Sequence, residues 1–164
     1  MSKSEITEQF IIIARRFCNW ATSDYPANLQ SVKQALELIT ELYLCGIRLT
    51  SEVQEVEEPT PIVETRESMR STVFTHAGNL PLNYYSEVFN PLTIPAEEPV
   101  IGDLADDIAD IYGDIEYGLS LVDAGFTEHA VWEWVFRMQT HWGEHATSAI
   151  RALHCYSSEQ HAFI

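Results

Sequence analysis

The segment GDLADDIADIYGDIEYGLSLVDAGF, residues 102–126, carries the clearest structural signal in the sequence. Apolar residues recur in it at the spacing of one helical face, namely Leu104, Ile108, Ile111, Ile115 and Leu119. Because an α-helix advances by about 100° per residue, this spacing places all five on one side. We therefore predict a helix that starts at Gly102-Asp103 and runs to about Val122.

A second stripe of the same segment consists of aspartates: Asp103, Asp107, Asp110 and Asp114. Like charges three or four residues apart destabilise a helix by a few tenths of a kcal/mol per pair, and aspartate is a poor helix former. The positive end of the helix accounts for Asp103, but Asp110 and Asp114 lie beyond the first turn. We expect a cation, a basic side chain or water to compensate these two carboxylates.

A second amphipathic segment follows after a tight break at residues 123–126. We predict a helix from Thr127 to about Tyr156. Its apolar stripe comprises Val131, Trp134, Val135, Met138, Trp142, Ala149 and Leu153. His141 and His145 lie within this stripe one turn apart, so they are expected to project in the same direction. Since so short a connection makes two helices antiparallel neighbours, the aspartates and the histidines are expected to meet.

Three interpretations of this meeting are open. In the first, the histidine rings hydrogen-bond buried aspartates and fix the helix register. In the second, imidazoles and carboxylates bind a divalent ion such as zinc, manganese or iron. The candidate ligands are Asp107, Asp110, Asp114, His141 and His145. In the third, a His–Asp pair acts as general acid and base without a metal.

The segment His141-Trp142-Gly143-Glu144-His145 also matches the H-x-x-E-H pattern of one class of zinc peptidases. Those enzymes are much larger and take a third ligand from far downstream. We therefore expect Glu144 at the helix surface instead of in a catalytic role.

Two further amphipathic helices are predicted near the N-terminus, over residues 5–20 and about 31–46. With the two later helices they make four long helices, and no segment alternates with the period of a strand. The sequence thus predicts an all-α fold, a helical bundle of four long helices in one domain of residues 1–164.

A long proline-rich crossover, roughly residues 49–99, separates the second and third of these helices. It contains six of the seven prolines in the chain, which excludes a long helix there. Within it we predict a short helix over residues 84–89, capped by Asn83. At the other end of the chain, residues 157–164 are expected to form a tail.

The charge of the chain limits its partners. The formal net charge is −16, and between Leu49 and Ala130 only Arg66 and Arg70 are basic. Such a surface repels phosphate backbones and anionic lipids, so nucleic acid and membranes are poor partners. A divalent cation or a basic protein partner fits better, and assembly into a homo-oligomer stays open.

Cysteine usage and the N-terminus favour a cytoplasmic location. Cys18, Cys45 and Cys155 are widely spaced and match no metal or redox motif, so we expect small buried side chains in a reducing compartment. Residues 1–5 lack the features of a secretion signal. The apolar run at residues 10–14 is too short to span a bilayer.

The two C-terminal segments carry a resemblance to a known family. Residues 102–112, followed by Gly118-Leu119, resemble the core motif of the bacterial family called domain of unknown function 5063. His141-Trp142-Gly143, with His145-Ala146 and residues 149–154, is similar to that family's second signature. The resemblance implies a helical bacterial protein, and it brings no activity and no catalytic residue with it.

Two functions of different classes follow from these observations. The net charge and the lack of a recognisable catalytic set favour a non-enzymatic module that contacts other proteins, with the Asp/His network as a structural element. The alternative is a divalent-metal-binding, hydrolase-like enzyme that uses the aspartates and histidines named above.

Overall fold

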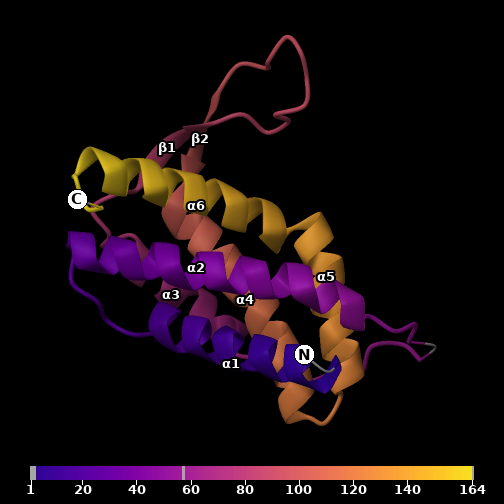
Figure 1. The fold of residues 1–164 in the computed structure, drawn as a ribbon. Coiled ribbons are helices and arrows are strands. Elements are labelled where there is room, and N and C mark those ends of the chain that lie inside the picture. Colours follow the sequence, from indigo (N-terminus) through magenta and orange to yellow (C-terminus); the bar gives the residue numbers. More distant parts are fainter. Residues whose placement is uncertain (1–2, 57, 164) are drawn as a thin grey trace.

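The computed structural model describes residues 3–56 and 58–163. Residues 1–2, at the N-terminus where no secretion signal is predicted, lie outside this part, as do residue 57 of the crossover and residue 164 of the predicted tail. The described part contains six α-helices and one two-stranded sheet (Figure 1). The elements are α1 (Lys3–Ala21), α2 (Leu29–Leu49), η1 (Thr50–Glu52), η2 (Glu67–Met69), α3 (Arg70–Ala77), β1 (Tyr84–Glu87), β2 (Val100–Asp103), α4 (Leu104–Asp123), α5 (Thr127–Thr140) and α6 (Trp142–Glu159).

The mainly helical architecture confirms the predicted class, whereas a bundle of four long helices is not confirmed. Helix α4 is central and contacts α1, α3, α5 and α6. Helix α2 packs between α1 and α6 on one side of the molecule (Figure 1). Within the described ranges, no helix combines the length and the apolar character needed to cross a bilayer.

Side-chain caps fix where two of the helices begin. Asn28 accepts a hydrogen bond from the backbone N–H of Ser31 at 2.9 Å, so α2 starts at Leu29, two residues before the predicted start near residue 31. Asp103 accepts hydrogen bonds from two N–H groups in the first turn of α4, which therefore begins at Leu104. The cap sets the register in which the later aspartates of α4 meet their neighbours.

Two fully buried tryptophans hold α5 and α6 against the rest of the core. The indole of Trp134 donates to the carbonyl of Ile115 at 3.1 Å, and the indole of Trp142 donates to the carbonyl of Trp134 at 2.9 Å. A Cβ atom on Gly118 would lie 2.1 Å from Nε1 of Trp134. Glycine at this position therefore allows the Trp134 ring to approach α4.

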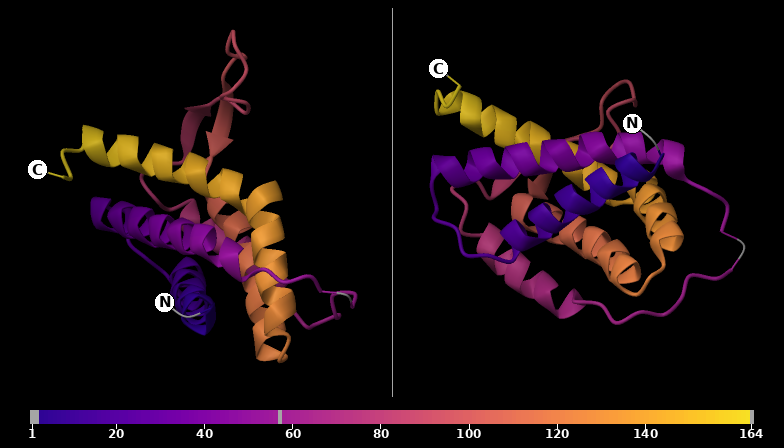
Figure 2. Two further views of the ribbon diagram at one scale, coloured as in Figure 1. Left: turned by 45° about the vertical axis from the view of Figure 1, so that its right-hand side comes forward. Right: turned by 60° about the horizontal axis from the view of Figure 1, so that its bottom comes forward.

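The predicted helix over residues 127–156 is in fact two helices that meet at His141. The backbone of His141 has φ −154° and ψ −83°, outside the helical region, and the chain changes direction there (Figure 2). A Cβ atom on Gly143 would lie 2.1 Å from the carbonyl oxygen of Met138, so only glycine permits this close junction. Helix α6 then continues to Glu159, which makes the start of the predicted tail helical.

Residues 84–103 form an arm that stands out from the helical body above α6 (Figures 1 and 2). Its strands β1 and β2 are antiparallel, with Tyr85 opposite Gly102. The helix predicted over residues 84–89 is therefore wrong. A Cβ atom on Gly102 would lie 2.5 Å from the Tyr85 ring, so the ring lies across the glycine. This pairing leaves the Tyr85 hydroxyl beside α4.

The crossover contains the short helix α3, which packs on α4 and is compatible with the prediction that no long helix forms there. One other expectation is corrected by the structure. The side chain of Cys155 is exposed, whereas Cys18 and Cys45 are buried as expected.

Substitution of Gly118 by alanine is expected to lower the free energy of unfolding by about 1–3 kcal/mol, because the buried Trp134 ring must move. Gly113→Ala in the same helix is the matched control. A Cβ atom there has its nearest neighbour at 3.9 Å, on Arg70, so the change should stabilise the helix by about 0.5–1 kcal/mol. Urea unfolding of both variants measures the difference, and equal effects would contradict the packing described for Trp134.

Candidate functional site

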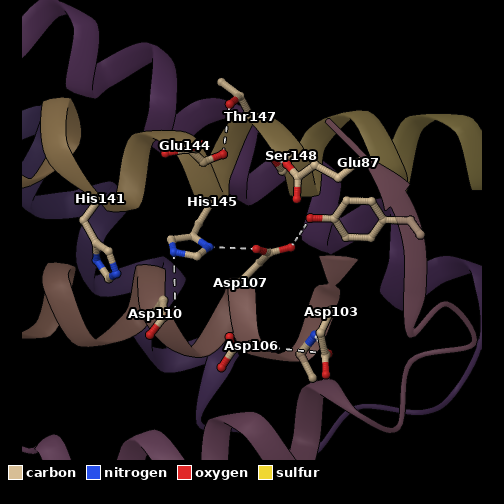
Figure 3. Close-up of polar contacts among 12 residues, drawn as sticks. Glu87, Asp103, Asp106, Asp107, Asp110, His141, Glu144, His145, Thr147 and Ser148 are labelled. Atoms are coloured by element: carbon tan, nitrogen blue, oxygen red, sulfur yellow. Dashed lines mark hydrogen bonds and ion pairs between the residues drawn. The ribbon is translucent and has the colours of Figure 1, made fainter. Parts of the chain in front are cut away.

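The polar site begins with Asp107, a buried carboxylate on α4. Nδ1 of His145 lies 2.8 Å from its Oδ1 atom, and the hydroxyl of Tyr85 donates to its Oδ2 atom at 2.5 Å (Figure 3). Because a carboxylate only accepts hydrogen bonds, Nδ1 of His145 carries the hydrogen. Helix α6 and the arm thus meet on one side chain of α4.

A second buried aspartate repeats the arrangement two turns further along α4. Nδ1 of His141 lies 2.7 Å from Oδ2 of Asp114. Arg137 donates to Oδ1 of the same carboxylate at 2.9 Å and to Glu133 at 3.0 Å. Each histidine ring is therefore held at Nδ1 by a buried carboxylate, which leaves Nε2 as the nitrogen available to another group.

Asp110 lies between these two aspartates on α4. Arg70 from α3 donates to Oδ1 of Asp110 and also contacts Asp106. The other oxygen, Oδ2, lies 3.5 Å from Nε2 of His145 (Figure 3). One donor atom each from Asp110, His141 and His145 lie within 4.8 Å of one another. The structure thus gathers three possible metal ligands from α4 and the start of α6.

Burial and hydrogen bonding shift the proton affinities of this site. The hydrogen bond to Asp107 raises the pKa of His145 above its ordinary value of 6.5, and it outweighs burial, which acts in the opposite direction. Burial raises the pKa of Asp107 despite the hydrogen bonds from His145 and Tyr85. Burial also raises the pKa of Tyr85, and the Asp107 carboxylate adds to that rise, so its hydroxyl stays a donor at neutral pH. All these shifts favour a proton on the group concerned.

The network carries more carboxylates than cations. Its largely buried carboxylates are Asp107, Asp110, Asp114 and Glu133. Arg70 and Arg137 supply two positive charges, which leaves a formal excess of two negative charges when both imidazoles are neutral. Two protons on the histidines would balance this excess, and so would one divalent cation.

The donor set is close to what a small divalent metal needs. Zinc binds histidine nitrogen at about 2.0–2.1 Å, so tetrahedral donors lie about 3.3 Å apart. Small rotations of the side chains, within the hydrogen bonds that hold both rings, would close the gap from 4.8 Å. A carboxylate bonded to the far nitrogen of a ligating imidazole is the usual second contact in metal sites. Asp107 and Asp114 occupy this second-contact position at Nδ1 of His145 and His141, respectively.

All five candidate residues predicted from the sequence lie at this one interface, but in two different positions. Asp110, His141 and His145 form the three-donor cluster, whereas Asp107 and Asp114 hold the rings. Glu144 is exposed on α6, as expected, and does not belong to the cluster.

Three contributors were missed by sequence reasoning. Arg70 could have been expected at this site from the sequence, because it is one of two basic residues between Leu49 and Ala130 and could therefore pair with the aspartates. The same holds for Arg137, because it lies four residues before His141 and so on the same side of the predicted helix. Tyr85 could not have been expected there, because its position depends on the pairing of two strands.

The raised pKa of His145 has a measurable consequence for stability. The additional stabilisation that a positively charged His145 gains from Asp107 contributes fully below about pH 6.5 and is lost as the pH rises through the higher folded-state pKa, although the neutral ring keeps its Nδ1–H bond to the carboxylate. We expect the difference in free energy of unfolding between the metal-free wild type and His145→Gln to decrease across that interval. Urea unfolding at stepped pH values measures it, and a difference that grows with pH would contradict the assignment.

The chain is similar to the crystal structure of protein BF1032 from Bacteroides fragilis, with 18% sequence identity, a TM-score of 0.69, and coverage of 89% of this chain and 88% of that chain. At this identity the likeness shows the fold alone. No curated protein matches the chain. The family model described as a domain of unknown function (DUF5063) matches residues 1–158, and the protein therefore belongs to the DUF5063 family.

Proposed function

We propose that the protein binds one divalent transition metal through Asp110, His141 and His145. The observation that carries the proposal is the fixed orientation of both imidazoles. Buried carboxylates hold each ring at Nδ1, at 2.7 and 2.8 Å, and a third carboxylate lies beside the free Nε2 of His145 at 3.5 Å. A neutral imidazole with its hydrogen on Nδ1 is ready to donate its Nε2 lone pair to a metal.

The chemistry of the donors selects the class of metal and of reaction. Two imidazoles and one carboxylate suit zinc, manganese or iron better than calcium or magnesium, which prefer oxygen. Three protein ligands leave a coordination position open, as in catalytic zinc sites, and the exposed ring of His141 places that position near solvent. A metal held by Asp110, His141 and His145 would supply Lewis-acid activation of water, so a hydrolase-like reaction is the activity that such a site would support.

A second candidate function, protein–protein contact with a basic partner, is supported by a different observation. The loop of the arm exposes large apolar side chains to an unusual degree: Leu92 is 88% and Ile94 is 91% exposed. A patch of this kind on an acidic protein of net charge −16 suits a partner with both apolar and basic residues. Either function is compatible with a cytoplasmic location, which the free state of all three cysteines supports.

The metal proposal is tested with protein prepared without an affinity tag, stripped with a chelator and titrated with Co²⁺ and Zn²⁺ at neutral pH. We expect one equivalent to bind, with visible absorption bands of low-symmetry Co²⁺ and a higher melting temperature. Binding should weaken as the pH falls below the raised pKa of His145, because the proton competes for the ring. A chain that binds no stoichiometric metal and melts unchanged would contradict the proposal.

Variants separate the ligands from the residues that orient them. His145→Gln and Asp110→Asn should abolish the Co²⁺ bands, whereas Asp107→Asn should weaken binding by about 10–100-fold. Glu128→Gln, an exposed site on α5, removes the same charge as the aspartate changes and should leave affinity unchanged. Equal losses in all four variants would indicate a general charge effect and not a defined site.

A further inference from the structure

A large cleft lies on one face of α6, next to the Asp/His site, because Tyr85 and Glu144 line it. Its volume is about 940 Å³, within the range of ligand-binding clefts. Helix α2 and the arm flank α6 on different sides of this face (Figures 1 and 2). Tyr43 of α2, Met138 of α5 and Phe89 of the arm contribute apolar walls.

Helix α6 lines the cleft with both short and long side chains, and the short ones are called the α6 floor here. These short residues are Gly143, Thr147, Ser148 and Ala152. Short residues let the backbone of another helix come close to α6, while the larger apolar walls would enclose the side chains of that helix. The shape therefore suits a helix laid along α6.

The charges around the cleft select the kind of helix. Glu87, Glu144 and Glu159 line it, and among its described lining residues Arg151 is the one base. The arm, residues 84–103, adds Glu97 and Glu98 and contains no lysine or arginine. A second copy of this chain, with the same net charge of −16, would be repelled from such a surface. A basic segment would be attracted to it.

We propose that this cleft binds an amphipathic helix of a partner protein, with leucine-like side chains on one face and lysines or arginines along its edges. The inference rests on the second proposed function and names the site and the class of partner. The apolar face would lie between the α6 floor and Phe89, which is 65% exposed without such a partner. The basic edges would pair with Glu144 and Glu159.

The chain contains its own reporter for this site. Cys155 lines the cleft and is exposed, while Cys18 and Cys45 are buried. The rate at which a maleimide alkylates Cys155 therefore measures access to the cleft. The probe is a synthetic amphipathic helix of leucine and lysine. Two control peptides are a scrambled sequence of the same composition and a leucine–glutamate helix.

At a peptide concentration about ten times its Kd, we expect alkylation of Cys155 to slow roughly tenfold, because only the unoccupied fraction reacts. The protection should decrease with added salt, and the control peptides should protect far less. Phe89→Ser and Glu144→Lys should each weaken the peptide affinity by about tenfold, the effect of one well-placed contact. Ile12→Ser on α1 and Glu128→Lys on α5 are the matched controls and should change it little.

Other outcomes would overturn the proposal in distinguishable ways. Binding seen by fluorescence anisotropy without protection of Cys155 would mean that basic partners contact another surface. This result would contradict the cleft as the binding site, but it would still support the proposed contact with a basic protein partner. No binding of the leucine–lysine helix would remove support for both. Concentration-dependent protection without peptide, together with a dimer in sedimentation, would show that a second copy occupies the cleft.

Discussion

The burial of two aspartates on one helix is the constraint on which the rest of this structure depends. An ionised carboxylate removed from water costs several kcal/mol unless it is paired and hydrogen-bonded. Helix α4 places Asp107 and Asp114 at 6% and 5% exposure, so their partners must come from the elements that cover them. The break at His141 and the close junction at Gly143 are what bring α6 and its imidazoles over α4.

Pairing alone does not account for the choice of histidine. Arg137 already bonds Asp114, and Arg70 bonds Asp110, so this fold can satisfy a carboxylate with arginine. A guanidinium has donors and no acceptor, whereas an imidazole that donates through Nδ1 keeps a lone pair on Nε2. The two rings lie with their centroids 4.8 Å apart, next to Asp110. The network therefore keeps basic donor atoms together beside an excess of negative charge, which is the environment that a divalent cation requires.

The sequence predicted this interface because it follows from helical periodicity, which is local. The apolar and acidic stripes of α4, and the two histidines of the next helical segment, lie where the spacing places them. The break at His141 was not predictable, because it depends on the contact between Gly143 and the Met138 carbonyl across the junction. Residues 84–89 were predicted as a short helix because Asn83 could cap it and Asn90-Pro91 could end it, whereas strand β1 (residues 84–87) forms only through pairing with residues 100–103. Tyr85 entered the site by that same long-range pairing.

The protonation state of the two rings tests the central claim most directly. Long-range proton–nitrogen NMR spectra of the metal-free protein, recorded above the pKa of His145, distinguish the two neutral forms of each imidazole. The account requires the hydrogen on Nδ1 of both His141 and His145, with Nε2 unprotonated, and a change at both Nε2 atoms when Zn²⁺ is added. Hydrogen on Nε2 of either ring would mean that the buried carboxylates do not orient these side chains as ligands, and the account would be contradicted.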